Sequence, residues 1–157
     1  ALQIGSDVPF FFSDPAGIVT GRGEIFETLQ ARTDCFGILI WPGVQSSTKE
    51  AYSLLDKQKG FRSSEYTAWG SEKLIKQYRA PFGTWSFVND FQPVLEQQYP
   101  VIGSACAALY KQGAEFAQMS GSGSAVFGLF GSESLTASAF KVLAKRWGWC
   151  KPFMLLA

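Results

Sequence analysis

The stretch Cys35-Phe36-Gly37-Ile38-Leu39-Ile40-Trp41 constrains the fold more than any other part of this sequence. It is continuously apolar, too short for a helix of ordinary length, and ended by the turn residues Pro42-Gly43. A run of this kind, without polar alternation, is typical of a central strand that is buried on both faces. The rest of the chain therefore has to provide neighbouring strands and a cover for each face of the sheet.

The segments after this strand give an ordered series of expected elements. They are a helix after Ser47 to about residue 59, a short helix at 71–78, helical content from Asn89 to Lys111 around Pro100, strands at 115–119 and 125–130 joined by a glycine turn, a helix at 132–147 and a strand at 152–156. Ser47 and Glu50 are spaced as a capping box for the first helix. The order β, α, more helices, β, turn, β, α, β predicts an α+β, ferredoxin-like (split β-α-β) sheet with extra helices inserted after the first helix.

Residues 1–33 are expected to belong to a different unit from residues 34–157. Short strand patterns at 8–12, 18–20 and 25–26 are separated by Gly- and Pro-containing turns. They predict a β-hairpin or meander that completes an upstream sheet. The opening residues Ala1–Gly5 resemble the end of a helix, so we expect the chain to be a fragment.

Composition excludes several functional classes. The 157 residues are 46% hydrophobic, enough for a compact core, and 14 basic against 13 acidic residues give a net charge of +1. This balance offers no electrostatic reason to expect nucleic acid or an anionic membrane as partner. The chain has no His and only three distant Cys, which argues against Ser-His or Cys-His hydrolysis, a Cys/His zinc site and a disulfide framework. A reducing compartment fits best, and no signal peptide or membrane-spanning run is visible.

Several residues have both a chemical and a structural interpretation. Gly121, Ser122 and Gly123 lie in a turn that could cradle phosphate with its amides, or could simply be a tight hairpin. Asp7 beside an apolar strand could abstract a proton or act as a turn residue. Tyr52 could stack on a base or lie at the edge of the core, and Asn89-Asp90 is by default a helix N-cap. The glycine turn is not a Walker or Rossmann motif.

Taken together, five segments resemble the motifs of one family in the order in which that family has them. They are Ile4–Phe11 (IGSDVPFF), Thr20–Glu24 (TGRGE), Pro42-Gly43 with Ser47–Tyr52 (STKEAY), Asn89–Pro93 (NDFQP) and Met119–Val126 (MSGSGSAV). On these segments the chain resembles the GHMP kinases, most closely the 4-diphosphocytidyl-2-C-methyl-D-erythritol kinases. The resemblance spans nearly the whole chain.

The resemblance implies a GHMP kinase C-terminal domain at 34–157, preceded by strands of the N-terminal domain. It implies phosphorylation of the 2-hydroxyl of 4-diphosphocytidyl-2-C-methyl-D-erythritol, a step of non-mevalonate isoprenoid synthesis, with ATP and Mg²⁺ and without nucleic-acid or membrane partners. Asp7 would be the catalytic carboxylate, Tyr52 would stack on the cytosine ring, and Gly121, Ser122 and Gly123 would help to close the substrate site. No residue is assigned to a metal. The expected location is the bacterial cytoplasm, or the plastid in a plant.

The chain departs from the family pattern in one respect. It has no match to the glycine- and serine-rich ATP loop or to the lysine paired with the aspartate, so we expect the isolated chain to be inactive without an N-terminal half. Two alternatives remain open: another GHMP small-molecule kinase, such as a homoserine or mevalonate kinase, and a non-catalytic ferredoxin-like binding module. An RNA-binding module is disfavoured because aromatic RNP-type strands are missing.

Overall fold

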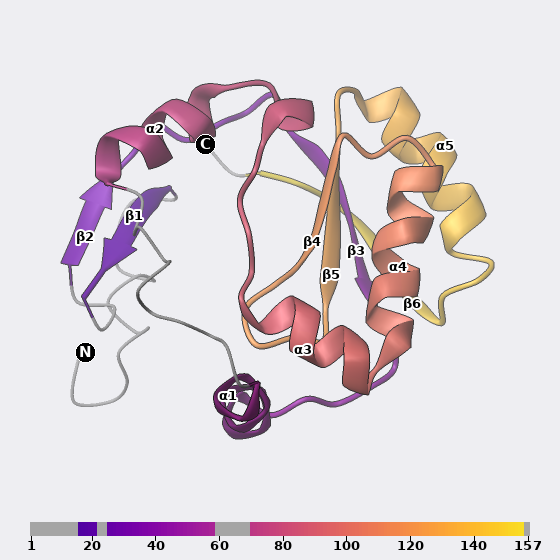
Figure 1. Cartoon of the computed structure of the whole chain (residues 1–157). Helices are drawn as coiled ribbons and strands as arrows, with labels where there is room; N and C mark the ends of the chain where they lie inside the picture. Colours follow the sequence, from indigo (N-terminus) through magenta and orange to yellow (C-terminus); the bar gives the residue numbers. More distant parts are fainter. Residues whose placement is uncertain (1–15, 22–24, 59–69, 156–157) are drawn as a thin grey trace.

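A computed structural model of the chain describes residues 16–21, 25–58 and 70–155, which form two antiparallel sheets (Figure 1). The smaller sheet is the hairpin of β1 (Gly17–Thr20) and β2 (Ile25–Thr28), as the sequence predicted for 18–20 and 25–26, while the strand predicted at 8–12 lies outside the described residues. The larger sheet has the order β4 (Phe116–Met119), β5 (Val126–Phe130), β3 (Phe36–Trp41) and β6 (Trp149–Met154). The apolar strand β3 is thus central, paired with β5 on one side and with β6 on the other.

The order of the four-stranded sheet confirms the ferredoxin-like prediction. If β3, β4, β5 and β6 are counted as the first to fourth strands of this sheet, their order across the sheet is 2-3-1-4. Helices α4 (Pro100–Lys111) and α5 (Glu133–Leu143) cover one face (Figure 1). The expected extra helices are α1 (Thr48–Lys57), α2 (Ser71–Arg79), the 3₁₀ turn η2 (Phe82–Thr84) and α3 (Phe91–Gln98).

The position of the extra helices differs from the expectation. α4, and not α1, is the crossover helix that packs on β4 and β5, while α1 packs on α3. The reason lies in the apolar surface of each helix: α1 buries Ala51, whereas α4 buries five residues, among them Ile102 and Leu109. The insertion therefore lies before the crossover helix.

Each face of the sheet has its own core. On the helix side, Ile38 and Ile40 of β3 pack with Val126 and Phe130 of β5 beneath α4 and α5. This core excludes water completely at Ile38, Ile40 and Phe130. Burial of such side chains is the main driving force for forming the sheet.

The described residues cover only part of the opposite face. Cys35, Phe116 and Leu129 pack there with Phe82, and Trp85 lies against this cluster. Leu39 is half-buried and Trp41 is 41% exposed, so the predicted burial of β3 on both faces holds only for the start of the strand. The uncovered part lies toward the end where β3 leads into α1.

Two glycines allow close approach within this architecture. A Cβ at Gly37 would lie 2.2 Å from the ring of Phe153, which covers the glycine from the neighbouring strand β6. A Cβ at Gly128 would lie 2.9 Å from Cδ2 of Leu109, so α4 rests directly on the backbone of β5. Both contacts depend on the missing side chain.

The last two elements have other limits than predicted. The helix expected at 132–147 ends at Leu143, because the chain then turns, with Trp147 N–H donating to Leu143 O, to bury Trp147 in the helix-side core. The final strand begins at Trp149 instead of 152 and contains Pro152 in its interior. β6 is an edge strand, and Leu155 N–H donates inward to Cys35 O. Since neighbouring residues of a strand face opposite edges, the nitrogen of Pro152 faces outward, where it costs no ladder bond.

Arg32 ties the hairpin connection to the four-stranded domain. Its guanidinium donates to the carbonyl oxygens of Tyr78 (2.9 Å) and Ala80 (2.7 Å) and lies 3.9 Å from the ring centre of Phe82. It also pairs with Asp34 at 2.6 Å, and this hydrogen bond lowers the pKa of the Asp34 carboxyl. The connection between the two sheets is thereby fixed at one point.

Candidate functional site

The start of α1 presents Tyr52 to solvent. Ser47 caps the helix by accepting a hydrogen bond from Glu50 N–H at 3.1 Å, which confirms the Ser47 half of the predicted capping box. The Glu50 carboxylate accepts a hydrogen bond from the Tyr99 hydroxyl at 2.6 Å and so joins α1 to the end of α3. Tyr52, on the second turn, is 55% exposed and meets Phe91 edge-to-face, with ring centres 4.9 Å apart and planes at 81°. The ring therefore lies outside the core.

The glycine turn is a hairpin loop between β4 and β5. Gly121 and Gly123 have φ values of 54° and 83°, a region that favours glycine. Ser120 N–H donates to Ala125 O, and Gly123 N–H donates back to Ser120 O. The tight-hairpin interpretation is therefore confirmed, and the phosphate-cradle interpretation stays a prediction.

Hydroxyl groups hold this loop against the connection between β3 and α1. Ser46 Oγ donates to Ser122 O at 2.8 Å, and Thr48 Oγ1 and Ser122 Oγ share a hydrogen bond at 2.9 Å. Ser124 Oγ donates to Val44 O. The loop and the first turn of α1 thus form one connected wall.

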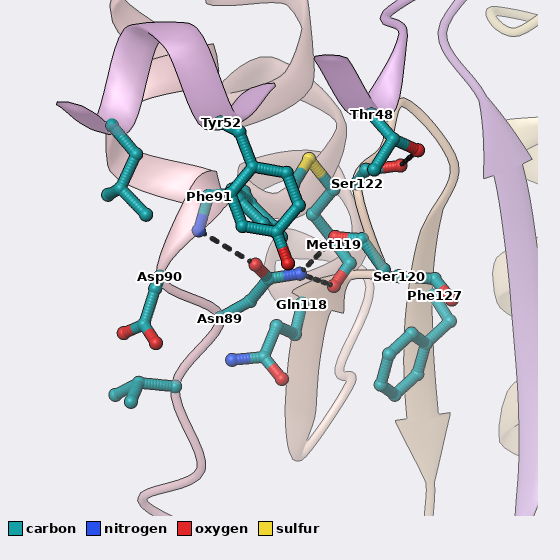
Figure 2. A pocket seen from close by; sticks show the side chains of 13 residues that line it. Thr48, Tyr52, Asn89, Asp90, Phe91, Gln118, Met119, Ser120, Ser122 and Phe127 are labelled. Carbon is teal, nitrogen blue, oxygen red and sulfur yellow. Dashed lines mark hydrogen bonds between the residues drawn. The ribbon is translucent and has the colours of Figure 1, made fainter. Parts of the chain in front are cut away.

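Asn89 has a role that the sequence pattern did not predict. Its Oδ1 accepts from Phe91 N–H at 3.0 Å and so closes an Asx turn just before α3, whose N-cap residue, Asp90, makes no side-chain capping bond. Its Nδ2, however, donates to Met119 O and to Gly121 O, each at 2.8 Å (Figure 2). The only local signal for this contact was the NDFQP segment itself.

These parts surround one cavity of about 710 Å³ (Figure 2). Its lining comes from α1, the segment that leads into α3, the end of β4, the glycine loop and β5: Thr48, Tyr52, Leu55, Val88, Asn89, Asp90, Phe91, Gln118, Met119, Ser120, Gly121, Ser122 and Phe127. Of the predicted site residues, the structure brings Tyr52, Gly121 and Ser122 together here. Gly123 faces a neighbouring hollow with Ser46 and Glu50, and Asp7 lies outside the described residues.

The cavity combines an aromatic face with polar groups of one loop. An exposed Tyr ring offers a flat apolar surface to a planar ligand, as in base stacking. The hydroxyls of Ser120 and Ser122 and the loop backbone, which line the same cavity, offer hydrogen bonds. The arrangement suits a ligand with a planar ring at one end and polar groups at the other.

The described part of the chain supplies neither a metal cluster nor a reactive thiol. Among its residues, no group of three or more His, Cys, Asp or Glu is gathered as a metal site requires. Cys35 and Cys106 are buried free thiols, and desolvation raises the pKa of each to about 11, so both are protonated at neutral pH. Within the same ranges, every helix is too short or too polar to cross a membrane.

Comparison with known proteins shows that the chain is similar to GHMP kinases. Residues 72–147 match the family described as GHMP kinases C terminal. The chain is 39% identical over 155 residues to a 4-diphosphocytidyl-2-C-methyl-D-erythritol kinase of Treponema pallidum (strain Nichols), covering 96% of this chain and 53% of that protein. It is 38% identical over 134 residues to the enzyme of the same name from Parabacteroides distasonis, covering 83% and 45%. The chain thus spans about half the length of the curated relatives it matches.

A solved structure supports the fold. The crystal structure of a 4-(cytidine 5'-diphospho)-2C-methyl-D-erythritol kinase superposes with a TM-score of 0.76 at 21% identity, covering 99% of this chain and 55% of that one. The family resemblance inferred from the five sequence segments is confirmed by these matches.

The loop geometry predicts unequal effects for two alanine substitutions. Gly121→Ala places a Cβ in open space and costs only the left-handed backbone strain, about 1–2 kcal/mol. Gly123→Ala has the same strain, and its Cβ would lie 2.7 Å from Sδ of buried Met119, which adds about 1–3 kcal/mol of overpacking. Urea denaturation of the two variants measures the difference. Equal losses of unfolding free energy would show that the loop is not packed on Met119.

Proposed function

Because the chain contains a GHMP kinase C-terminal domain, we propose that it is part of a 4-diphosphocytidyl-2-C-methyl-D-erythritol kinase. Such an enzyme transfers a phosphoryl group from ATP to the 2-hydroxyl of its substrate in non-mevalonate isoprenoid synthesis. The observation that carries the proposal is the 39% identity along 96% of the chain, which includes the segments that build the cavity. In this proposal residues 1–33 end the N-terminal domain and residues 34–157 form the C-terminal domain.

The cavity supports separate binding places for the cytosine ring and for the diphosphate of the substrate. The free face of Tyr52 is available for the cytosine ring, since Phe91 contacts Tyr52 through an edge-to-face pair and leaves the tyrosine 55% exposed. The Gly121–Gly123 segment then faces the diphosphate and the methylerythritol. The distance between the Tyr52 ring and the Gly121–Gly123 segment would favour a ligand whose planar ring and diphosphate are separated by that same distance.

Phosphoryl transfer requires mainly that its reactants be positioned. The substrate hydroxyl oxygen forms a bond to the γ-phosphorus of ATP, the bond from that phosphorus to the leaving oxygen of ADP breaks, and the hydroxyl proton passes to a base. Asp7 is the proposed base, by its place in the GSDVPFF segment. Mg²⁺, when bound with ATP, would neutralise charge on the phosphates. Among the described residues no group of three or more His, Cys, Asp or Glu is gathered that could hold the ion without the nucleotide. ATP would be held mainly by the family's glycine- and serine-rich loop, to which no segment of residues 1–157 has a match.

A substrate comparison tests the proposed reaction. The complete enzyme that contains this chain, supplied with ATP, should phosphorylate 4-diphosphocytidyl-2-C-methyl-D-erythritol with a kcat/KM at least about 100-fold above that for homoserine or mevalonate. The cytidine group supplies the additional binding at Tyr52. Equal or better turnover of homoserine or mevalonate would assign the chain to another GHMP kinase. Absence of turnover with all three would favour the non-catalytic module.

Stacking on Tyr52 predicts a contrast between two substitutions. Tyr52→Ala should raise KM for the cytidine substrate, since losing a base–aromatic stack costs about 1–3 kcal/mol. Tyr52→Phe keeps the ring and should stay near the wild type. Steady-state kinetics of both variants give the answer. Equal effects would indicate a role for the hydroxyl, and no effect from either would return Tyr52 to a structural role.

The proposed base predicts a loss in kcat. Asp7→Asn keeps the size of the side chain and removes its basic form, so kcat should fall by about 10²-fold or more while substrate binding changes little. If Asp7 were only a turn residue, Asn would replace it well, because Asn accepts the same turns and caps. A kcat close to that of the wild type would therefore contradict the catalytic assignment without contradicting the family.

A further inference from the structure

Among the residues that the structure describes, no strand pairs with the outer side of β4 at its end. β4 is an edge strand, and Ser120 N–H donates toward β5, so the backbone groups of the preceding residue, Met119, face outward. Two side-chain amides satisfy them: Met119 N–H donates to Gln92 Oε1 and Met119 O accepts from Asn89 Nδ2, both at 2.8 Å. The segment at the start of α3 thus takes the place of a strand at the point where the loop begins.

Asn89 extends this contact into the loop. The same Nδ2 donates to Gly121 O at 2.8 Å, so one amino group bridges the residue before the loop and its first glycine. Oδ1 accepts from Phe91 N–H at 3.0 Å. This position requires two donors and one acceptor on a short side chain, and only an Asn side chain has that set at this length.

Asn89 also lies between the two parts of the cavity that are proposed to bind the substrate, the Tyr52 ring and the glycine loop. On one side it fixes the backbone of the glycine loop, and on the other it fixes the backbone of Phe91, whose ring supports Tyr52. Figure 2 shows its amide among Tyr52, Phe91 and the Met119–Ser122 segment. A displacement of this amide would change the spacing between ring and loop.

We propose that Asn89 is a positioning residue that sets the distance between the Tyr52 ring and the glycine loop, so that a substrate held at the ring presents its hydroxyl correctly. This inference rests on the proposed kinase function. A misplacement of about 1 Å can cost about 100-fold in rate, so the effect falls on turnover more than on binding. The contact between the rings of Tyr52 and Phe91 is made without the Asn89 side chain.

The test is Asn89→Asp in the complete enzyme. Asp has the same shape and keeps the acceptor for Phe91 N–H, but it places a carboxylate oxygen against the carbonyls of Met119 and Gly121. We expect kcat to fall by about 10-fold or more, with KM for the cytidine substrate within about 3-fold. Asn89→Ala, which adds no charge, should also lower kcat. It replaces Asn89→Asp as the test if the Asp variant does not fold.

A matched control separates positioning from general destabilisation. Gln77 Nε2 donates to Thr84 O at 2.8 Å outside the cavity, so Gln77→Glu makes the same amide-to-carboxylate change against a backbone carbonyl. It should leave kcat within about 2-fold. Equal losses of kcat in the Asn89 and Gln77 variants, or a normal kcat in Asn89→Asp, would overturn the proposal.

Amide hydrogen exchange tests the same contact without any activity. In Asn89→Asp, exchange at Gly121–Ser124 should accelerate by about 10-fold or more, while β3 and α5 keep their protection. Unchanged loop exchange would show that Asn89 does not hold the loop, and uniform acceleration would show a structural role only. An enzyme inactive before substitution would refute the proposed function, and the exchange result would still decide whether Asn89 fixes the loop.

Discussion

The burial of β3 is the constraint on which the structure depends. This strand carries Ile38 and Ile40 into the helix-side core and pairs with a strand on each side. Two helices cover one face, and the aromatic cluster around Phe82 covers the start of the other. Because the hydrophobic gain is shared among all these elements, the sheet, α4 and α5 are expected to form together. The inserted helices α1, α2 and α3 then have to fit around this unit.

The position of the cavity is set by the two points at which the inserted segment α1–α3 connects to the sheet, α4 and α5. The chain leaves at the end of β3, where it builds α1 with Tyr52, and it returns at α3 beside the end of β4. Both points are near the β4–β5 loop, which Ser46 and Thr48 hold from one side and Asn89 holds from the other. Three segments distant in sequence therefore meet at one cavity, although none of them has the cavity as a local property.

The sequence predicted the elements that local patterns determine. Apolar continuity located β3, the Ser47 cap located the start of α1, and the glycines located the β4–β5 turn. It misjudged the end of α5 and the start of β6, since the burial of Trp147 and the pairing with β3 are tertiary effects. The contact of Asn89 with Gly121, 32 residues away, was not predictable because a side-chain amide can satisfy a distant carbonyl without any periodic signal. Asp7 remains a prediction from resemblance.

The two edges of the four-stranded sheet are closed in different ways. At the β4 edge, the amides of Asn89 and Gln92 occupy the outward groups of Met119, and at the β6 edge Pro152 offers no outward N–H. An open edge is a template on which strands of other molecules can add, and such growth leads to aggregation. Side-chain amides and proline thus obstruct intermolecular strand addition at both edges. The Asn89 contact that holds the glycine loop therefore also occupies an outward carbonyl of this edge, where a strand of another molecule would otherwise pair.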